Sequence, residues 1–68
     1  MNITKRLTVT RINDENFPFV VESEYESTTG TWNVMSRFNA RTFPMIVVNR
    51  VAGRADYRII VRVSKEAR

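Results

Sequence analysis

The chain has 68 residues, no cysteine, no histidine and a net charge of +4 at pH 7. These counts exclude disulfides, thiolate metal sites and histidine-based acid–base or metal chemistry. A chain of this length is near the lower limit for folding around one hydrophobic core. We therefore expect residues 1–68 to form one small domain, stabilised by a well-packed sheet or by a homo-oligomer.

Charge is distributed unevenly along the chain. Residues 1–12 carry three basic side chains, residues 13–31 carry five acidic ones, and residues 32–68 carry eight basic against two acidic ones. Nine of the eleven basic residues are arginine, whose planar guanidinium suits phosphates, carboxylates and aromatic faces. This bias favours a surface that contacts an acidic partner.

The first predicted strand covers residues 3–12, where apolar and polar side chains alternate. Ile3, Leu7 and Val9 share one face, and the opposite face carries Thr4, Arg6, Thr8 and Thr10. The composition agrees, because valine, isoleucine and threonine number nine, five and seven, whereas leucine occurs once. β-branched residues fit a pleated sheet and are stiff in a helix. The next segment, residues 12–18, is rich in turn-forming residues and predicts a turn.

The second predicted strand follows this turn in the sequence FPFVVESEYES. One face carries the apolar side chains Phe17, Phe19, Val21 and Tyr25, and the other carries Glu22, Glu24 and Glu26. The third predicted strand is the segment TWNVMSRF, residues 31–38. It puts Trp32, Val34 and Phe38 on the apolar face if the preceding loop has an even number of residues. We therefore expect a two-residue turn within Ser27–Gly30.

The last two predicted strands form a hairpin, residues 43–51 and 57–63, around a loop at residues 52–56. The odd positions are the apolar ones, namely Phe43, Met45, Val47, Val51, Tyr57, Ile59, Val61 and Val63. The final residues, SKEAR, are expected to make at most one helical turn. The fold class predicted from these elements is all-β: a five-stranded antiparallel meander in a small barrel-like or strongly bent sheet.

Four arginines recur at every fourth position, Arg50, Arg54, Arg58 and Arg62. A spacing of four returns to the same face of a strand, so Arg50, Arg58 and Arg62 are predicted to share one face of the hairpin, with Arg54 at its tip. One interpretation pairs this row with the glutamates of the second strand as an ordinary solvated surface. The other makes it a nucleic-acid-binding stripe, supported by Arg37 and Arg41.

Three apolar side chains, Ile46, Val48 and Ile60, fall among these arginines on the predicted even face. An apolar patch with an arginine rim fits a protein interface or a self-association surface better than a nucleic-acid groove. The competing interpretation is a central hairpin that is covered on both sides. We therefore favour a protein-binding module, an inhibitor or accessory protein of the size that viruses and mobile elements encode, over a nucleic-acid-binding domain.

No catalytic or cofactor motif is present in the sequence. It has only Gly30 and Gly53 as glycines, no metal-ligand spacing and no nucleophile–base pair built on Cys or His. We therefore expect no enzyme activity, no cofactor and no metal. The N-terminal segment carries Lys5 and Arg6 and lacks a signal-peptide core, and no apolar run is long enough for a membrane span. The expected location is the cytoplasm.

Overall fold

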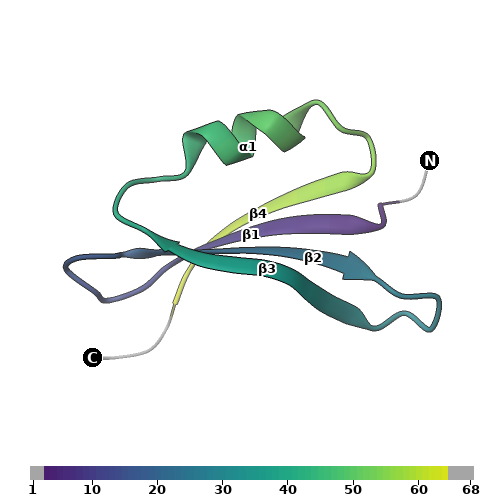
Figure 1. Cartoon of the computed structure of the whole chain (residues 1–68), viewed down its shortest axis with the longest axis horizontal. Helices are drawn as coiled ribbons and strands as arrows, with labels where there is room; N and C mark the ends of the chain where they lie inside the picture. Colours follow the sequence, from purple (N-terminus) through teal and green to yellow (C-terminus); the bar gives the residue numbers. More distant parts are fainter. Residues whose placement is uncertain (1–2, 65–68) are drawn as a thin grey trace.

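The computed structural model describes residues 3–64, which form a four-stranded mixed sheet with one helix on one of its faces (Figure 1). The strands are β1 (Lys5–Arg11), β2 (Phe19–Glu26), β3 (Trp32–Ala40) and β4 (Tyr57–Val63), and helix α1 (Met45–Ala52) connects β3 to β4. The strand order is β3-β2-β1-β4, so β3 and β4 are the two edges. β1 pairs antiparallel with β2 and parallel with β4.

The prediction of a mostly β domain is confirmed, but the predicted five-stranded antiparallel meander is wrong. Residues 45–52 form α1 instead of a strand, and β4 pairs with β1 rather than with its sequence neighbour. The sheet has four strands, is mixed and is not closed. A helical turn was expected for the segment SKEAR. Four of its five residues, 65–68, lie outside the described residues.

Helix α1 forms against the preference of its own side chains. Ile46, Val47 and Val48 are consecutive β-branched residues, which favour a strand. However, parallel strands can be joined only by a crossover connection, and one face of the sheet is apolar and must be covered. The helix begins after Pro44, and Gly53 follows its last residue.

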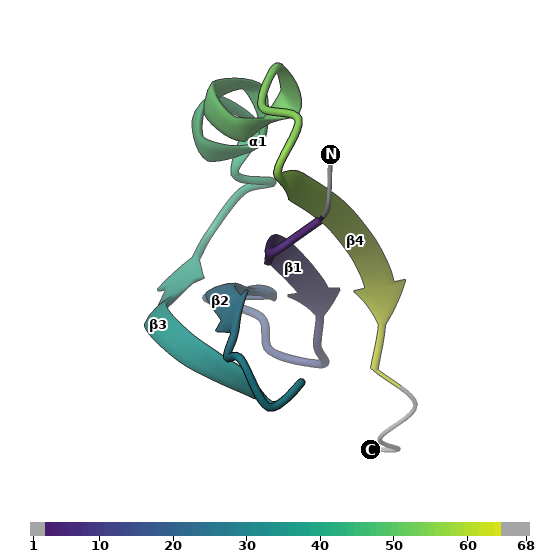
Figure 2. The ribbon, with the colours of Figure 1, turned by 90° about the vertical axis from the view of Figure 1, so that its right-hand side faces the viewer.

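The core lies between α1 and one face of the sheet, called here the covered face. Leu7, Val9, Val21 and Val51 are buried, and six partly buried side chains pack around them: Phe19, Phe43, Val47, Val48, Tyr57 and Ile59. Figure 2 shows α1 above the β4 side of the sheet and well away from β3. The covered face is therefore only partly covered. Among residues 3–64, no helix is long and apolar enough to cross a membrane.

The β2–β3 hairpin differs from the prediction in the length of its loop and in a bulge in β3. The two differences together leave Phe38 on the face that was predicted for it. The Ser27 C=O accepts from Gly30 N–H at 3.0 Å and Ser27 N–H donates to Thr31 at 2.8 Å, so the loop has three residues, 28–30, and Gly30 has a positive φ of 86°. Trp32 and Val34 therefore lie on the glutamate face, and not with the core. A bulge at Met35 then shifts the register and returns Phe38 to the covered face, opposite Val21.

Candidate functional site

The four arginines at every fourth position do not form one row. Arg50 lies in the last turn of α1 and Arg54 in the connection to β4, both next to the covered face. Arg58 and Arg62 lie on β4, and because Ile59 packs into the core, these two point to the opposite face, called here the open face. The predicted hairpin, which would have put Arg50, Arg58 and Arg62 on one face with Arg54 at its tip, does not exist. Each side of the sheet receives two of the four arginines instead.

The predicted apolar patch is also separated. Ile46 projects away from the sheet and is 76% exposed, whereas Val48 packs against the core. Ile60 lies on the open face between Arg58 and Arg62 and is half-buried. Helix periodicity distributes Ile46 and Val48 differently from strand periodicity, so the three side chains form no common surface.

The two supporting arginines make local contacts. Arg37, on β3, lies 3.8 Å from the carboxylate of Glu22 across the open face. Arg41 follows β3, and its guanidinium lies 5.0 Å from the ring centroid of Phe17. Neither lies beside the α1–β4 connection or on β4, so neither joins the pair Arg50 and Arg54 or the pair Arg58 and Arg62.

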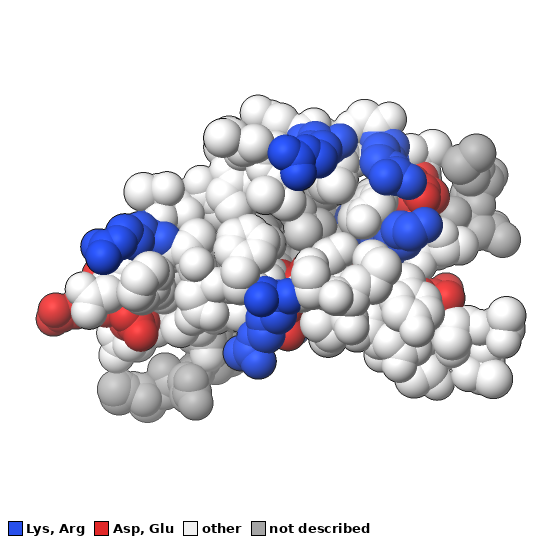
Figure 3. Space-filling model, viewed as in Figure 1, with Lys and Arg blue, Asp and Glu red and all other residues white. Residues whose placement is uncertain are grey.

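A groove opens on the covered face between α1 and strands β2 and β3, and is called here the α1–β3 groove. Its volume is about 290 Å³. The residues that line it come from all four strands, from α1 and from the α1–β4 connection: Leu7, Val21, Ser23, Ser36, Phe38, Val47, Arg50, Val51, Arg54 and Tyr57. Figure 3 views this side of the molecule and shows basic side chains over α1 and towards the connection to β4.

The groove combines an apolar floor with a basic rim. Its floor includes the buried side chains of Leu7, Val21 and Val51. Phe38 is 43% exposed although it lies on the covered face, because α1 does not reach β3. Arg50 is exposed at the rim, and within the described residues it makes no ion pair and no side-chain hydrogen bond. This arginine therefore has free donors beside an apolar surface.

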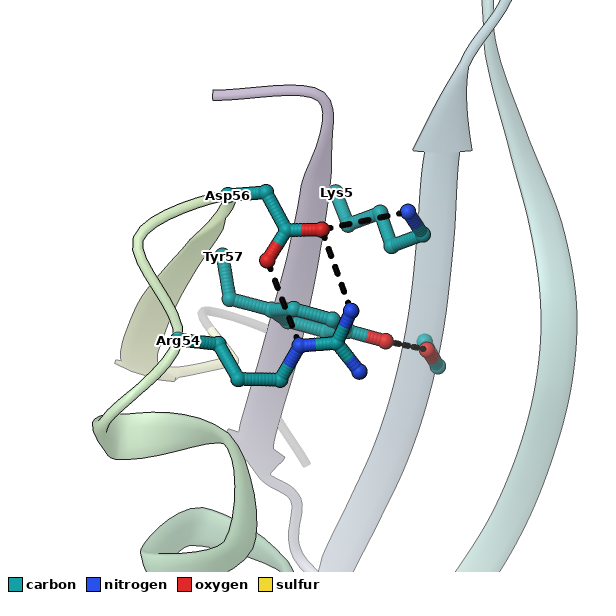
Figure 4. Close-up of polar contacts among 5 residues, drawn as sticks. Lys5, Arg54, Asp56 and Tyr57 are labelled. Atoms are coloured by element: carbon teal, nitrogen blue, oxygen red, sulfur yellow. Dashed lines mark hydrogen bonds and ion pairs between the residues drawn. The ribbon is translucent and has the colours of Figure 1, made fainter. Parts of the chain in front are cut away.

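A polar cluster borders the groove where Arg54 and Tyr57 line it (Figure 4). The Asp56 carboxylate accepts hydrogen bonds from Lys5 Nζ at 3.2 Å and from Arg54 Nε and Nη2, each at 3.2 Å. The Arg54 guanidinium lies 5.1 Å from the Tyr57 ring centroid. The Tyr57 and Ser23 hydroxyls share a hydrogen bond at 3.4 Å. These contacts fix the Tyr57 ring as a wall of the groove.

The charges of this cluster do not cancel. Desolvation acts to raise the pKa of Asp56, but the hydrogen bonds from Lys5 and Arg54 outweigh it, so the pKa lies below its usual value of 3.8. The carboxylate is thus ionised at neutral pH and shared by two cations. Together with Arg50, the rim keeps a net positive charge, which attracts an anionic group that approaches the apolar floor.

The open face has a different chemistry, built around Glu24, whose side chain is only 14% exposed. Arg6 donates to it from Nε at 2.7 Å and from Nη2 at 3.3 Å, and Thr8 donates at 3.3 Å. The Arg6 guanidinium also lies 4.1 Å from the Trp32 ring. The hydrogen bond from Arg6 lowers the pKa of Glu24 below 4.5 and raises the pKa of Arg6. This network gives the Glu24 carboxylate three hydrogen bonds from side chains of β1.

Sequence reasoning did not identify Phe38, Ser23 and Ser36 as groove residues. One signal was available: Ser23 interrupts the apolar side of β2, between Val21 and Tyr25. A polar side chain on the core-facing side of a strand indicates that the helix does not cover the sheet at that position. Within residues 3–64, no three carboxylates come together in a way that could hold a metal ion.

Comparison with known proteins gave no significant match to a family model, to a curated protein or to a solved structure. The functional interpretation therefore depends on the geometry of this chain alone.

Proposed function

We propose that this protein is a non-enzymatic protein-binding module whose α1–β3 groove receives an apolar side chain from an acidic segment of its partner. Such a module acts as an inhibitor or accessory protein by occupying a surface of that partner. The observation that carries the proposal is the groove itself, in which an apolar floor lies beside Arg50, a guanidinium without a partner among the described residues.

Two physical features support a protein segment as the ligand. Buried aromatic and arginine side chains are the usual anchors of protein interfaces, and Phe38 and Arg50 supply one of each at the groove. An apolar side chain that fills the floor loses contact with water, which is favourable by about 25 cal/mol per Å². A neighbouring carboxylate on the partner can accept hydrogen bonds from Arg50, a charge-assisted contact stronger than a neutral one.

The alternative function, nucleic-acid binding, keeps support from the overall basic charge and the arginine content. The separation of the arginines weakens it, because a strand bound to one face contacts two of the four. The expected log–log slope of affinity against salt is then about −1.8 on duplex DNA, rather than −3 to −4 for a continuous row. Titration with single- and double-stranded oligonucleotides at about 0.15 M salt, up to about 100 μM protein, tests this.

The protein-binding proposal is tested by selecting peptides from a random display library on the immobilised full chain. Selected peptides are synthesised, and their affinities are measured by calorimetry. We expect sequences that combine carboxylates with a large apolar side chain. Arg50→Gln and Phe38→Ala should each weaken binding by about tenfold or more, the effect of about 1.4 kcal/mol.

Arg58→Gln is the matched control for Arg50→Gln. Both arginines are exposed and without a partner in the described residues, but Arg58 lies on the open face. Arg58→Gln should leave the affinity of groove-binding peptides unchanged. Selected peptides without carboxylates, or equal effects of the Arg50 and Arg58 variants, would contradict the proposal.

A further inference from the structure

We propose that the outer edge of β4 is a second binding surface, which accepts a β-strand of alternating acidic and apolar residues from a partner protein. This inference goes beyond the proposed function because it uses another surface and another mode of recognition. In strand addition, main-chain hydrogen bonds supply affinity and alternate side chains supply specificity.

The backbone of β4 is prepared for such an addition. The Asp56 C=O accepts from Lys5 N–H at 3.0 Å, and Ser64 N–H donates to the Arg11 C=O at 2.8 Å. Even-numbered residues therefore direct their backbone groups towards β1, and odd-numbered ones direct theirs outwards. Within the described residues, the outward N–H and C=O groups of Ile59, Val61 and Val63 make no hydrogen bond.

The two edges of the sheet differ in regularity. β3 contains the bulge at Met35, which breaks its row of backbone groups and is one of the devices that protect an edge from added strands. β4 is matched to β1 over all of Tyr57–Val63 with no register shift. The regular edge is therefore β4.

Side chains along β4 define the partner. On the covered face, Val61 is 60% and Val63 is 70% exposed, because α1 reaches only about 12 Å along a strand of about 23 Å. On the open face, Arg58 has no partner among the described residues, and Arg62 makes one hydrogen bond, to Thr10 at 3.3 Å. An added strand that places apolar residues beside the valines and carboxylates beside the arginines complements both faces.

A second copy of this chain fits this edge less well. β4 contains two arginines and no carboxylate, so pairing two β4 strands would gather four guanidiniums on adjacent strands without an acidic side chain. Like charges on neighbouring strands destabilise the pair. The charge of β4 therefore points to an acidic partner strand.

The probe is the capped peptide SVEVTVEVS, whose central residues read the same in both directions and so fit a parallel or antiparallel addition. Its valines fall beside the odd positions of β4 and its glutamates beside Arg58 and Arg62. The control peptide SVKVTVKVS has the same strand preference and the opposite charge. Binding to the full ¹⁵N-labelled chain is followed by NMR, and we expect the amides of Ile59, Val61 and Val63 to shift. The glutamate peptide should bind about tenfold more tightly than the lysine peptide, since two cross-strand pairs change sign.

Two protein variants separate strand addition from other contacts. Val61→Pro removes an outward N–H that the β1–β4 pairing does not use, as edge strands tolerate, and should abolish binding. Val61→Thr keeps the N–H and the β-branched shape and should retain it. Arg58→Glu should bring the ratio of the affinities of the glutamate and lysine peptides close to one. Arg50→Gln, in the groove, should leave this ratio unchanged.

Three results would overturn the proposal: no binding of the glutamate peptide at about millimolar concentration, binding that survives Val61→Pro in a folded variant, or shifts confined to β3 or to the groove. Concentration-dependent dimerisation that Val61→Pro abolishes would assign the edge to a second copy instead. If Val61→Pro does not fold, the ratio of the affinities of the glutamate and lysine peptides is compared between wild type and Arg58→Glu. A ratio that Arg58→Glu leaves unchanged would overturn the proposal. Loss of groove binding in the peptide selection leaves these outcomes unaffected, so the two proposals can fail separately.

Discussion

The covered and open faces of the sheet are made by the same strands, yet different interactions stabilise them. The covered face is apolar, with Leu7, Val9 and Val21 under α1. The open face buries Thr8, which is 3% exposed, and Val20, which is 6% exposed, and it also carries the ion pair of Arg6 with Glu24. Alternation thus builds two surfaces in one layer, one sensitive to side-chain volume and the other to charge.

The largest expected effect comes from truncating the covered face. Leu7→Ala removes a side chain that is 2% exposed and should cost about 3 kcal/mol. A domain of this size has a total stability of about 3–5 kcal/mol, so the variant should keep only about 0–2 kcal/mol of stability and be partly unfolded at the low end of that range. Urea denaturation followed by circular dichroism measures this. Val61→Ala, on the same face but 60% exposed, is the control, and an equal loss in both variants would refute a core centred on Leu7.

Breaking the charge network of the open face should have the next largest effect. Glu24→Gln removes the carboxylate that Arg6 and Thr8 contact, and hydrogen bonds to a charged group contribute about 1.5–3 kcal/mol. The loss should be about 2 kcal/mol in the same denaturation experiment. Glu26→Gln, at an exposed position on the same strand, should change the stability little. Equal stability of the two variants would mean that the network contributes nothing.

Acidification should lower the stability of the fold through carboxylates that include Glu24 on the open face. The Glu24 pKa is lower in the folded chain than its ordinary value of 4.5, so the ionised carboxylate stabilises the fold above that value. This contribution disappears as the pH falls from 4.5 through the lower folded pKa, because protons then bind the unfolded chain more readily. Asp14, whose carboxylate accepts from the backbone N–H groups of Phe17 and Asn16, shifts in the same direction.

Unfolding free energies measured from about pH 7 to about pH 3 should therefore fall for wild type. They should fall less for Glu24→Gln, which has lost one of the shifted groups. A pH dependence as steep in Glu24→Gln as in wild type would assign the effect to other carboxylates.

The smallest expected effect distinguishes two arginines that lie opposite each other on β1 and β4, Arg6 and Arg58. Arg6→Gln removes the Glu24 ion pair and the contact with Trp32, and should lower the stability measurably. Arg58→Gln removes no contact among the described residues and should stay within about 0.5 kcal/mol of wild type. Thermal unfolding of both variants tests the difference, and a larger loss in Arg58→Gln would show that β4 depends on its charge.

Where strand alternation was clear, sequence reasoning located the element and its faces. Leu7 and Val9 on β1, Val21 on β2 and Ile59 on β4 all lie on the predicted apolar side, because the two-residue period is a local property of an extended chain. The turn at residues 12–18 was equally local, since Asp14 binds the backbone two and three residues ahead. The glutamates of β2 likewise took the predicted opposite face.

The structure of residues 43–52 depended on distant residues. The side chains of Ile46, Val47 and Val48 favour a strand, but a short chain with one apolar sheet face needs a covering element, and this segment was the one that could supply it. Because residues 45–52 form a helix, β4 pairs parallel with β1. Arg50 and Arg54 therefore lie on the side of the sheet that α1 covers, whereas Arg58 and Arg62 lie on the other side. The groove and the free edge of β4 both exist because residues 45–52 form a helix instead of a strand. The burial of apolar side chains across the whole chain determines this, and the local periodicity of the sequence does not.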